Sequence, residues 1–325
     1  MFRITAILVT LALAVLLALY LTGPRVDADT TVSFDPTAIG PDPQAYIEAE
    51  EADVPGLRPD LAKEIVWAYP QSRAKTPLAI VYIHGFSASK GELRPMPDKV
   101  AAELGANLFY TRLAGHGRDG PAMAEATVNA WVNDYAEAIA IGRAIGEKVV
   151  VIATSTGASL ATWAATDPEL SRDVIGMVLI SPNYGVQNAG AWLLTMPWGG
   201  QIAHLVAGRE REFQPRSEAH GRYWTTRYPT SATLPMAALT ELARAAPVET
   251  VATPGLFIFS DADKVVQPER TRAIAERWGA AHETMIVEGS DDPNNHVIAG
   301  DALSPSTTAL VAGRISAWIG SLQPR

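Results

Sequence analysis

The sequence predicts an α/β fold in which helices cover both faces of a mostly parallel sheet. From about residue 64 onward, short runs of apolar and β-branched residues alternate with stretches of helical spacing. Continuous apolar strands that alternate with helices are typical of parallel sheets that are buried on both faces. The alternation stops at about residues 183–246, which predicts a helical cap inserted between core strands 6 and 7.

Composition and charge narrow the class of protein. The chain has 325 residues, of which 48% are hydrophobic and 19% are charged, as in a globular protein with a large core. Its net charge is −9 and its basic residues are scattered, which argues against a nucleic-acid partner. It contains no cysteine, so disulfides, thiolate metal sites and cysteine nucleophiles are excluded.

Residues 1–23 predict a transmembrane anchor or a signal segment. Nineteen residues without a charge run from Ile4 to Thr22, and a bilayer core needs a helix of ~20 apolar residues. Arg3 precedes this stretch and several aspartates follow it. This favours membrane contact through residues 4–22, with the domain on the periplasmic or extracellular side. The alternative is secretion after signal cleavage, for which Val26–Ala28 is an imperfect site.

The rest of the chain divides into a linker and a domain. Pro, Asp and Ala are frequent in residues 24–60, which predict a linker with one short helix at 45–54. The domain is expected at residues 61–325. Its strands are expected at 64–69, 78–85, 106–113, 148–153, 174–181, 255–259 and 282–289, and its main helices at 96–105, 130–146, 157–166, 268–279 and 307–322.

A serine stands between the expected strand 148–153 and the helix that follows it. The stretch "ATSTG" resembles the turn G-x-S-x-G, in which a catalytic serine is held between a strand and a helix. Ala153 replaces the first glycine, while Gly157 keeps the second. Alanine accepts β-region dihedrals without strain, so the replacement affects local packing. A lone serine in such a turn is more often a helix cap, so the turn alone leaves both interpretations open.

Four further motifs occur along the chain in a fixed order. They are "YIHGFSAS" at 82–89, "RLAGHGRD" at 112–119, "SDADKVV" at 260–266 and "NNHVIAGD" at 294–301. With the serine turn, they make the sequence similar to the α/β-hydrolase family over about residues 75–320. It resembles bacterial carboxylesterases and monoacylglycerol lipases in particular. Ser260 departs from the glycine that many relatives have at that place.

The resemblance implies a catalytic triad of Ser155, Asp263 and His296, in the chain order of this fold. Ser155 would be the nucleophile, His296 its general base, and Asp263 the carboxylate that fixes the imidazole tautomer. Backbone N–H groups of Phe86 and Thr156 would form the oxyanion hole.

Other acids and histidines near these motifs receive lesser roles. Asp261 is a rival for the acid, expected instead to serve the N–H groups of its own turn. Asp291 and Asp292, beside the histidine loop, are the next candidates for the acid of the triad. His84 and His116 resemble histidines of the family that support loops. No cofactor is implied, and no pattern such as H-E-x-x-H suggests a metal.

The leading hypothesis is therefore a serine carboxylic-ester hydrolase that acts on a small acyl ester or lipid. Alternatives on the same fold are an aminopeptidase, a thioesterase or a C–C bond hydrolase. An aminopeptidase would need carboxylates that bind a free amine, for which the cap offers Glu210, Glu212 and Glu218. A membrane-tethered binding protein without activity is a further alternative. Four cap aromatics either line an acyl pocket or form the cap's own core: Trp192, Trp198, Tyr223 and Trp224.

Overall fold

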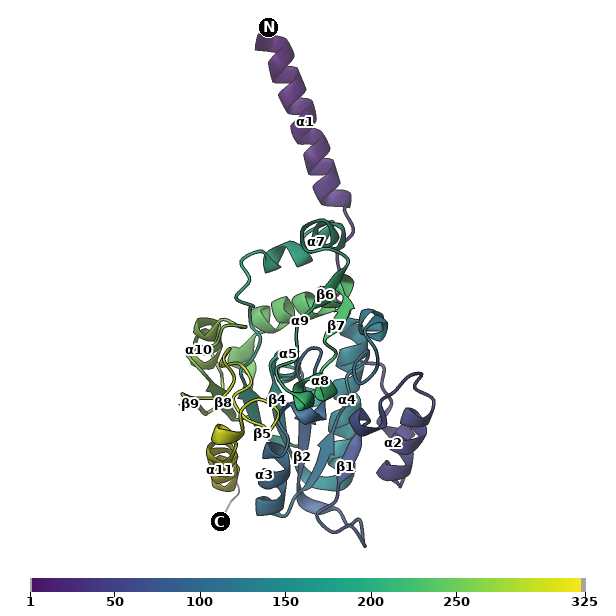
Figure 1. The fold of residues 1–325 in the computed structure, drawn as a ribbon, viewed down its shortest axis with the longest axis vertical. Helices are drawn as coiled ribbons and strands as arrows, with labels where there is room; N and C mark the ends of the chain where they lie inside the picture. Colours follow the sequence, from purple (N-terminus) through teal and green to yellow (C-terminus); the bar gives the residue numbers. More distant parts are fainter. Residues whose placement is uncertain (1, 323–325) are drawn as a thin grey trace.

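The computed structural model describes residues 2–322, in which seven strands form one sheet in the order β1-β3-β2-β4-β5-β8-β9 (Figure 1). β1 is antiparallel to β3, and the other neighbouring strands are parallel. The predicted fold class is confirmed. The strands are β1 Glu64–Val66, β2 Thr76–Ile83, β3 Asn107–Tyr110, β4 Gly146–Thr154, β5 Val174–Ile180, β8 Gly255–Phe259 and β9 His282–Ile286.

Alternate residues of the central strands face two separate hydrophobic clusters. Ala79, Val81 and Ile83 belong to one cluster, and Ile80 and Tyr82 belong to the other. This period of two places an apolar layer on each face of the sheet, which the helices cover. One face carries α4 Val128–Ile145, α5 Thr156–Ala164 and α10 Pro268–Glu276, and the other carries α3 Met96–Leu104 and α11 Pro305–Leu322. Short helices in the connections are η3 Lys90–Glu92, η4 Pro121–Glu125, α6 Pro168–Ser171 and η7 Val248–Thr250.

The inserted segment lies between β5 and β8. Five of the seven sheet strands precede it, so it separates the fifth and sixth strands of this sheet and not the sixth and seventh that were predicted. Besides short helices it contains an antiparallel pair of strands, β6 and β7, whose exposed residues gave no apolar alternation in the sequence. Its elements are η5 Ala191–Thr195, α7 Gly199–Ala207, β6 Glu210–Glu212, α8 Glu218–Tyr223, β7 Arg227–Pro229, η6 Thr230–Ala232 and α9 Thr233–Ala245.

Helix α1, Phe2–Thr22, projects from the domain beside the inserted segment (Figure 1). It is the helix, within the described part of the chain, that is long and apolar enough to cross a membrane.

The segment predicted as a linker is instead folded onto the domain. It forms η1 Pro36–Ile39, α2 Pro43–Ala52 and η2 Pro59–Leu61. Asp35 and Asp42 cap the first two of these helices. Apolar side chains of the segment, Ile47 among them, are buried against the sheet's helices. Its Pro and Asp residues are therefore helix starts and caps, which a compositional view takes for linker signals.

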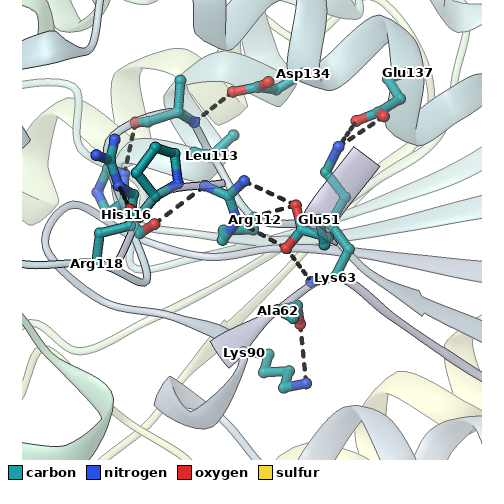
Figure 2. Close-up of polar contacts among 12 residues, drawn as sticks. Glu51, Ala62, Lys63, Lys90, Arg112, Leu113, His116, Arg118, Asp134 and Glu137 are labelled. Carbon is teal, nitrogen blue, oxygen red and sulfur yellow. Dashed lines mark hydrogen bonds and ion pairs between the residues drawn. The ribbon is translucent and has the colours of Figure 1, made fainter. Parts of the chain in front are cut away.

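One buried ion pair fastens this segment to the core, and a second forms just beyond it (Figure 2). Arg112 Nη2 lies 2.8 Å from Glu51 Oε1, and Lys63 Nζ lies 2.6 Å from Glu137 Oε2. Arg112 also donates to the carbonyl oxygen of His116, at 3.2 Å. The N-terminal segment is thereby connected to the turn that follows β3.

Candidate active site

Ser155 occupies a sharp turn between β4 and α5. Its backbone has φ 52° and ψ −118°, a positive-φ conformation that a residue with a side chain adopts only when its surroundings impose it. Its N–H donates to the carbonyl of Ile180 on the neighbouring strand, at 2.9 Å. Within residues 2–322, the hydroxyl makes no capping hydrogen bond to α5. The hydroxyl is therefore available for another partner.

The two positions that flank the serine differ in how much space they leave. A methyl group at Gly157 would lie 2.5 Å from the carbonyl oxygen of His84 and 2.6 Å from that of Ile83. Only glycine allows α5 to approach β2 so closely. Ala153, by contrast, lies within β4 with its methyl group fully buried in the core. The departure from the usual motif is thus accommodated by packing.

Three of the sequence-predicted residues lie in one hydrogen-bonded series. His296 Nε2 is 3.0 Å from Ser155 Oγ, and His296 Nδ1 is 2.8 Å from Asp263 Oδ2. The other carboxylate oxygen of Asp263 accepts the N–H groups of Val265, at 2.7 Å, and Val266, at 2.9 Å. The three side chains follow β4, β8 and β9, so they meet at the carboxyl edge of the sheet.

The environment of His296 sets its pKa. Burial of the ring acts to lower the pKa, whereas the negative charge and hydrogen bond of Asp263 raise it. The carboxylate prevails, so the pKa of His296 lies above its ordinary value. A hydrogen bond from Nδ1–H to Asp263 leaves Nε2 as the acceptor that faces the serine hydroxyl.

The neighbouring aspartates have other partners. Asp261 is exposed and forms an ion pair with Arg272 of α10, so the expectation that it serves its own turn is wrong. Instead, Asp263 accepts the N–H groups of its own turn, those of Val265 and Val266, through its Oδ1. Asp292 is buried, and its Oδ2 accepts the N–H groups of His296 and Val297, each at 3.1 Å. Asp292 therefore holds the backbone of the histidine loop.

Phe86 lies in a loop whose neighbouring N–H groups are already engaged. Gly85 N–H donates to Glu92 Oε2 at 2.7 Å, and Ser87 N–H donates to His116 Nε2 at 3.0 Å. The N–H of Phe86 lies between these two fixed groups. The N–H of Thr156 is the first of α5, where a helix has no acceptor of its own and carries partial positive charge.

His84 and His116 both hold loops by hydrogen bonds. His84 Nε2 accepts the N–H of Leu113 at 3.1 Å, as His116 does for Ser87. Burial lowers the pKa of both rings, that of His116 to about 4, so both are neutral acceptors.

Sequence reasoning missed Glu92. Its side chain is buried beside Gly85, and a methyl group at Gly85 would lie 2.9 Å from Glu92 Oε1 and 3.1 Å from Ser155 Cβ. Burial raises the pKa of Glu92 to about 7, although the hydrogen bond from Gly85 and the nearby His296 oppose this rise. An acidic residue in a loop gives no sequence signal for burial. Glu92 is found only once the loop is folded over the serine.

A cavity of about 580 Å³ lies over Ser155 and His296. Such a volume is typical of small-molecule sites. Its wall contains many apolar side chains, and residues 2–322 provide no group of three or more acidic or histidine side chains that could hold a metal ion. Of the four cap aromatics, Trp224 lines the cavity and Tyr223 packs over Gly91. Trp192 and Trp198 are 59% and 37% exposed, so neither an acyl pocket nor a cap core describes them.

The comparisons with known proteins agree with this architecture. The model of the alpha/beta hydrolase family matches residues 80–301, and the chain belongs to that family. A thermostable monoacylglycerol lipase of Bacillus sp. (strain H-257) is 25% identical over 210 residues, which cover 65% of this chain and 80% of that protein.

Two solved structures share the fold. One, from work on the metagenome-derived lipolytic enzymes LipS and LipT, has a TM-score of 0.66 at 21% identity and covers 82% of this chain and 99% of its own. A soluble variant of monoglyceride lipase from Saccharomyces cerevisiae has a TM-score of 0.59 at 13% identity, covering 81% and 92%. The predicted family resemblance is confirmed, and the prediction of an ester-bond hydrolase agrees with the names of these relatives.

Proposed function

We propose that this chain is a membrane-anchored serine carboxylic-ester hydrolase that forms an acyl-enzyme on Ser155. The observation that carries the proposal is the hydrogen-bonded series from Asp263 through His296 to Ser155, at a cavity of about 580 Å³. The ester hydrolases among the relatives support the reaction class. A strained serine that is not used as a helix cap further supports a role as nucleophile.

In acylation, Ser155 Oγ attacks the ester carbonyl carbon while its proton passes to His296 Nε2. The carbonyl oxygen becomes an oxyanion, which accepts the N–H groups of Phe86 and Thr156. Asp263 stabilises the imidazolium without taking its proton. Collapse of the tetrahedral intermediate breaks the C–O bond, and His296 protonates the leaving alcohol. The acyl group remains on Ser155.

In deacylation, water takes the place of the alcohol. His296 Nε2 removes a proton from the water as its oxygen attacks the acyl carbon. The same two N–H groups stabilise the second oxyanion. Its collapse returns the proton to Ser155 and releases a carboxylic acid. The fixed orientation of the imidazole, held through Nδ1 by Asp263, serves both steps.

The substrates we propose are short- to medium-chain acyl esters or monoacylglycerols. The Bacillus relative named as a monoacylglycerol lipase and the apolar side chains of the cavity wall support this class. An aminopeptidase receives less support, because Glu210, Glu212 and Glu218 are exposed and Glu210 is paired with Arg227. The carboxylates that line the cavity, Glu92 and Asp292, are engaged by Gly85 and by the histidine loop.

We assign α1 as the anchor, with the domain on the periplasmic or extracellular side. Its length and apolar composition support this placement. We expect the full chain to fractionate with membranes and to resist extraction with alkaline carbonate. Recovery of the whole pool as a shortened soluble form would instead establish a cleaved signal peptide.

The test of the reaction is the variant S155A. It should lose esterase activity by several orders of magnitude while its circular dichroism and melting temperature stay unchanged. A fluorophosphonate probe should label the unaltered chain and not S155A. The assay uses p-nitrophenyl esters of graded chain length beside aminoacyl anilides. More than a few per cent residual activity in a folded S155A, or faster cleavage of the anilides, contradicts the proposal.

A further inference from the structure

Large apolar side chains are exposed together on one side of the inserted segment. Trp192 in η5 is 59% exposed, Trp198 is 37% exposed, and Leu205 and Val206 in α7 are 87% and 72% exposed. We call these four residues the outer cap face. η5 and α7 pack against each other, so the four residues lie on adjoining elements of the inserted segment. A concentration of exposed apolar side chains in a folded domain marks a site of interaction.

The outer cap face is fastened to the end of α1. Trp198 Nε1 donates to the carbonyl oxygen of Leu19 at 3.0 Å, and Trp198 N–H donates to that of Pro24 at 2.8 Å. Leu19 lies in the last turn of α1, where carbonyl groups lack intrahelical partners. Figure 1 shows α7 directly at the base of α1. Trp198 therefore holds the face at the level of the last turn of α1.

The chain that leaves α1 is also held along the domain. Asn129 Nδ2 donates to Asp29 Oδ2 at 3.0 Å and to Thr31 O at 2.9 Å. Asn133 Oδ1 accepts the N–H groups of Ser33, at 2.7 Å, and Phe34, at 2.9 Å. Both asparagines lie on α4, so the connection is not a flexible linker. The orientation of the domain relative to α1 is fixed at both ends of this connection.

We propose that the outer cap face lies in the interfacial region of the same bilayer that holds α1, and that the cavity takes its lipid ester directly from that bilayer. The inference rests on the anchor role assigned to α1 above. A helix of 21 residues is ~31 Å long, which matches a bilayer core of ~30 Å and brings Leu19 to its boundary. Tryptophan and tyrosine favour this boundary, and Trp198 hydrogen-bonds to Leu19 in the last turn of α1, which also contains Tyr20.

The same elements form the wall of the cavity. Leu193 of η5 and Ile202 of α7 line the cavity, while Trp192 and Leu205 face outward. Val206 does both, because it lines the cavity and is 72% exposed. One short helix therefore separates the interior of the cavity from the proposed lipid surface. An acyl chain that enters beside α7 stays in apolar surroundings throughout, so its desolvation cost is small.

A single reporter thiol can test the position of the face, since the chain contains no cysteine. We would label the full-length variant L205C with an environment-sensitive fluorophore in phosphatidylcholine vesicles. The matched control is L310C, because Leu310 is 58% exposed on α11, far from α1 (Figure 1). A lipid with a nitroxide at the headgroup end of its acyl chain should quench the label at 205 roughly fivefold more than that at 310. Aqueous iodide should quench them in the opposite order.

The other outcomes can be distinguished from one another, and all but the last overturn the inference. If the chain floats with vesicles and hydrolyses p-nitrophenyl butyrate, but both labels are equally open to iodide, the docking is wrong and the proposed function stands. A label at 205 shielded from both quenchers indicates a protein partner, such as a second copy, instead of lipid. A chain that does not float refutes the anchor and the docking together. Docking with an active S155A refutes the catalytic proposal alone.

An activity measurement complements the label. The variant L205Q should hydrolyse monoacylglycerol embedded in vesicles roughly tenfold more slowly, while its rate on the soluble p-nitrophenyl ester stays unchanged. L310Q should alter neither rate. Equal rates of L205Q and the unaltered chain on the embedded lipid would contradict direct transfer from the bilayer.

Discussion

Replacing Asp263 by asparagine tests the proposed acid in a way that the geometry makes specific. Asp263 Oδ1 accepts two backbone N–H groups, those of Val265 and Val266, while Oδ2 accepts His296 Nδ1–H. In D263N, the amide oxygen must take the Oδ1 position to satisfy both backbone donors. The NH₂ group then faces His296 Nδ1, which becomes the acceptor. The proton moves to Nε2, and the ring loses its ability to remove the proton of Ser155.

The size of the effect follows from the alternatives that D263N has. Turning the amide to restore the productive tautomer leaves the N–H groups of Val265 and Val266 buried without an acceptor, at about 1–3 kcal/mol each. Loss of the carboxylate also removes a charge-assisted hydrogen bond to the imidazolium, worth about 1.5–3 kcal/mol. Together these effects agree with the roughly 10⁴-fold loss that such a change causes in serine hydrolases, about 5.4 kcal/mol.

The pH profile of kcat/KM provides a second test of the role of Asp263. The Asp263 carboxylate holds the pKa of His296 above its ordinary value, against the effect of burial. The base is neutral only above that pKa, so activity falls as the pH decreases through it. In D263N the residual activity should therefore extend to lower pH than in the unaltered chain.

The matched control is D261N, because Asp261 is exposed and its ion pair with Arg272 lies at the surface. Its turnover should stay within about twofold. The rates of both variants are measured by stopped-flow or steady-state hydrolysis of a p-nitrophenyl ester from pH 5 to 9. If D261N is the crippled variant, or if both are equally mild, the geometric reasoning about the triad acid is refuted.

Two further predictions concern the surroundings of the site. Glu92→Gln keeps an acceptor for Gly85 N–H but removes the negative charge that Glu92 carries above its own pKa of about 7 and that raises the pKa of His296. The acid limb of kcat/KM should therefore move to lower pH by less than in D263N, at nearly full turnover. Glu92→Leu, which removes the acceptor, should lower kcat by roughly 10- to 100-fold. Equally slow turnover of the glutamine and leucine substitutions would contradict this division. Glu51→Ala leaves Arg112 buried without its partner and should cost about 3–5 kcal/mol in chemical denaturation, whereas Asp173→Asn, at an exposed pair, should cost below about 1 kcal/mol.

The sheet and the reactive loops could be predicted because their signals are local. Continuous apolar runs identify buried strands whatever lies around them, and the helix expected at 96–105 ends at Gly105 in the left-handed conformation that glycine favours. The family resemblance favoured Asp263 over Asp261, and the structure places the former beside His296.

Other features depend on distant parts of the chain. The burial of Glu92 requires the loop after β2 to fold over Ser155, which no stretch of sequence announces. The packing of α2 depends on Arg112, about sixty residues later in the chain, and composition alone suggests a linker there. The outer position of Trp198 depends on the end of α1, which the sequence separates from it by more than 170 residues.

These distant contacts link helix α2 to the proposed oxyanion loop. Glu51 pairs with Arg112, Arg112 donates to the carbonyl of His116, and the ring of His116 accepts the N–H of Ser87 beside Phe86. The segment between α1 and β1 thus has two roles: its first part fixes the orientation of the domain against α1, and its helix α2 supports a loop of the site. A buried ion pair contributes little net stability over apolar packing, but it tolerates few alternative arrangements. Here the ion pair is connected through His116 and Ser87 to Phe86, the proposed oxyanion donor. It therefore helps to hold one loop geometry where the reacting carbonyl would bind.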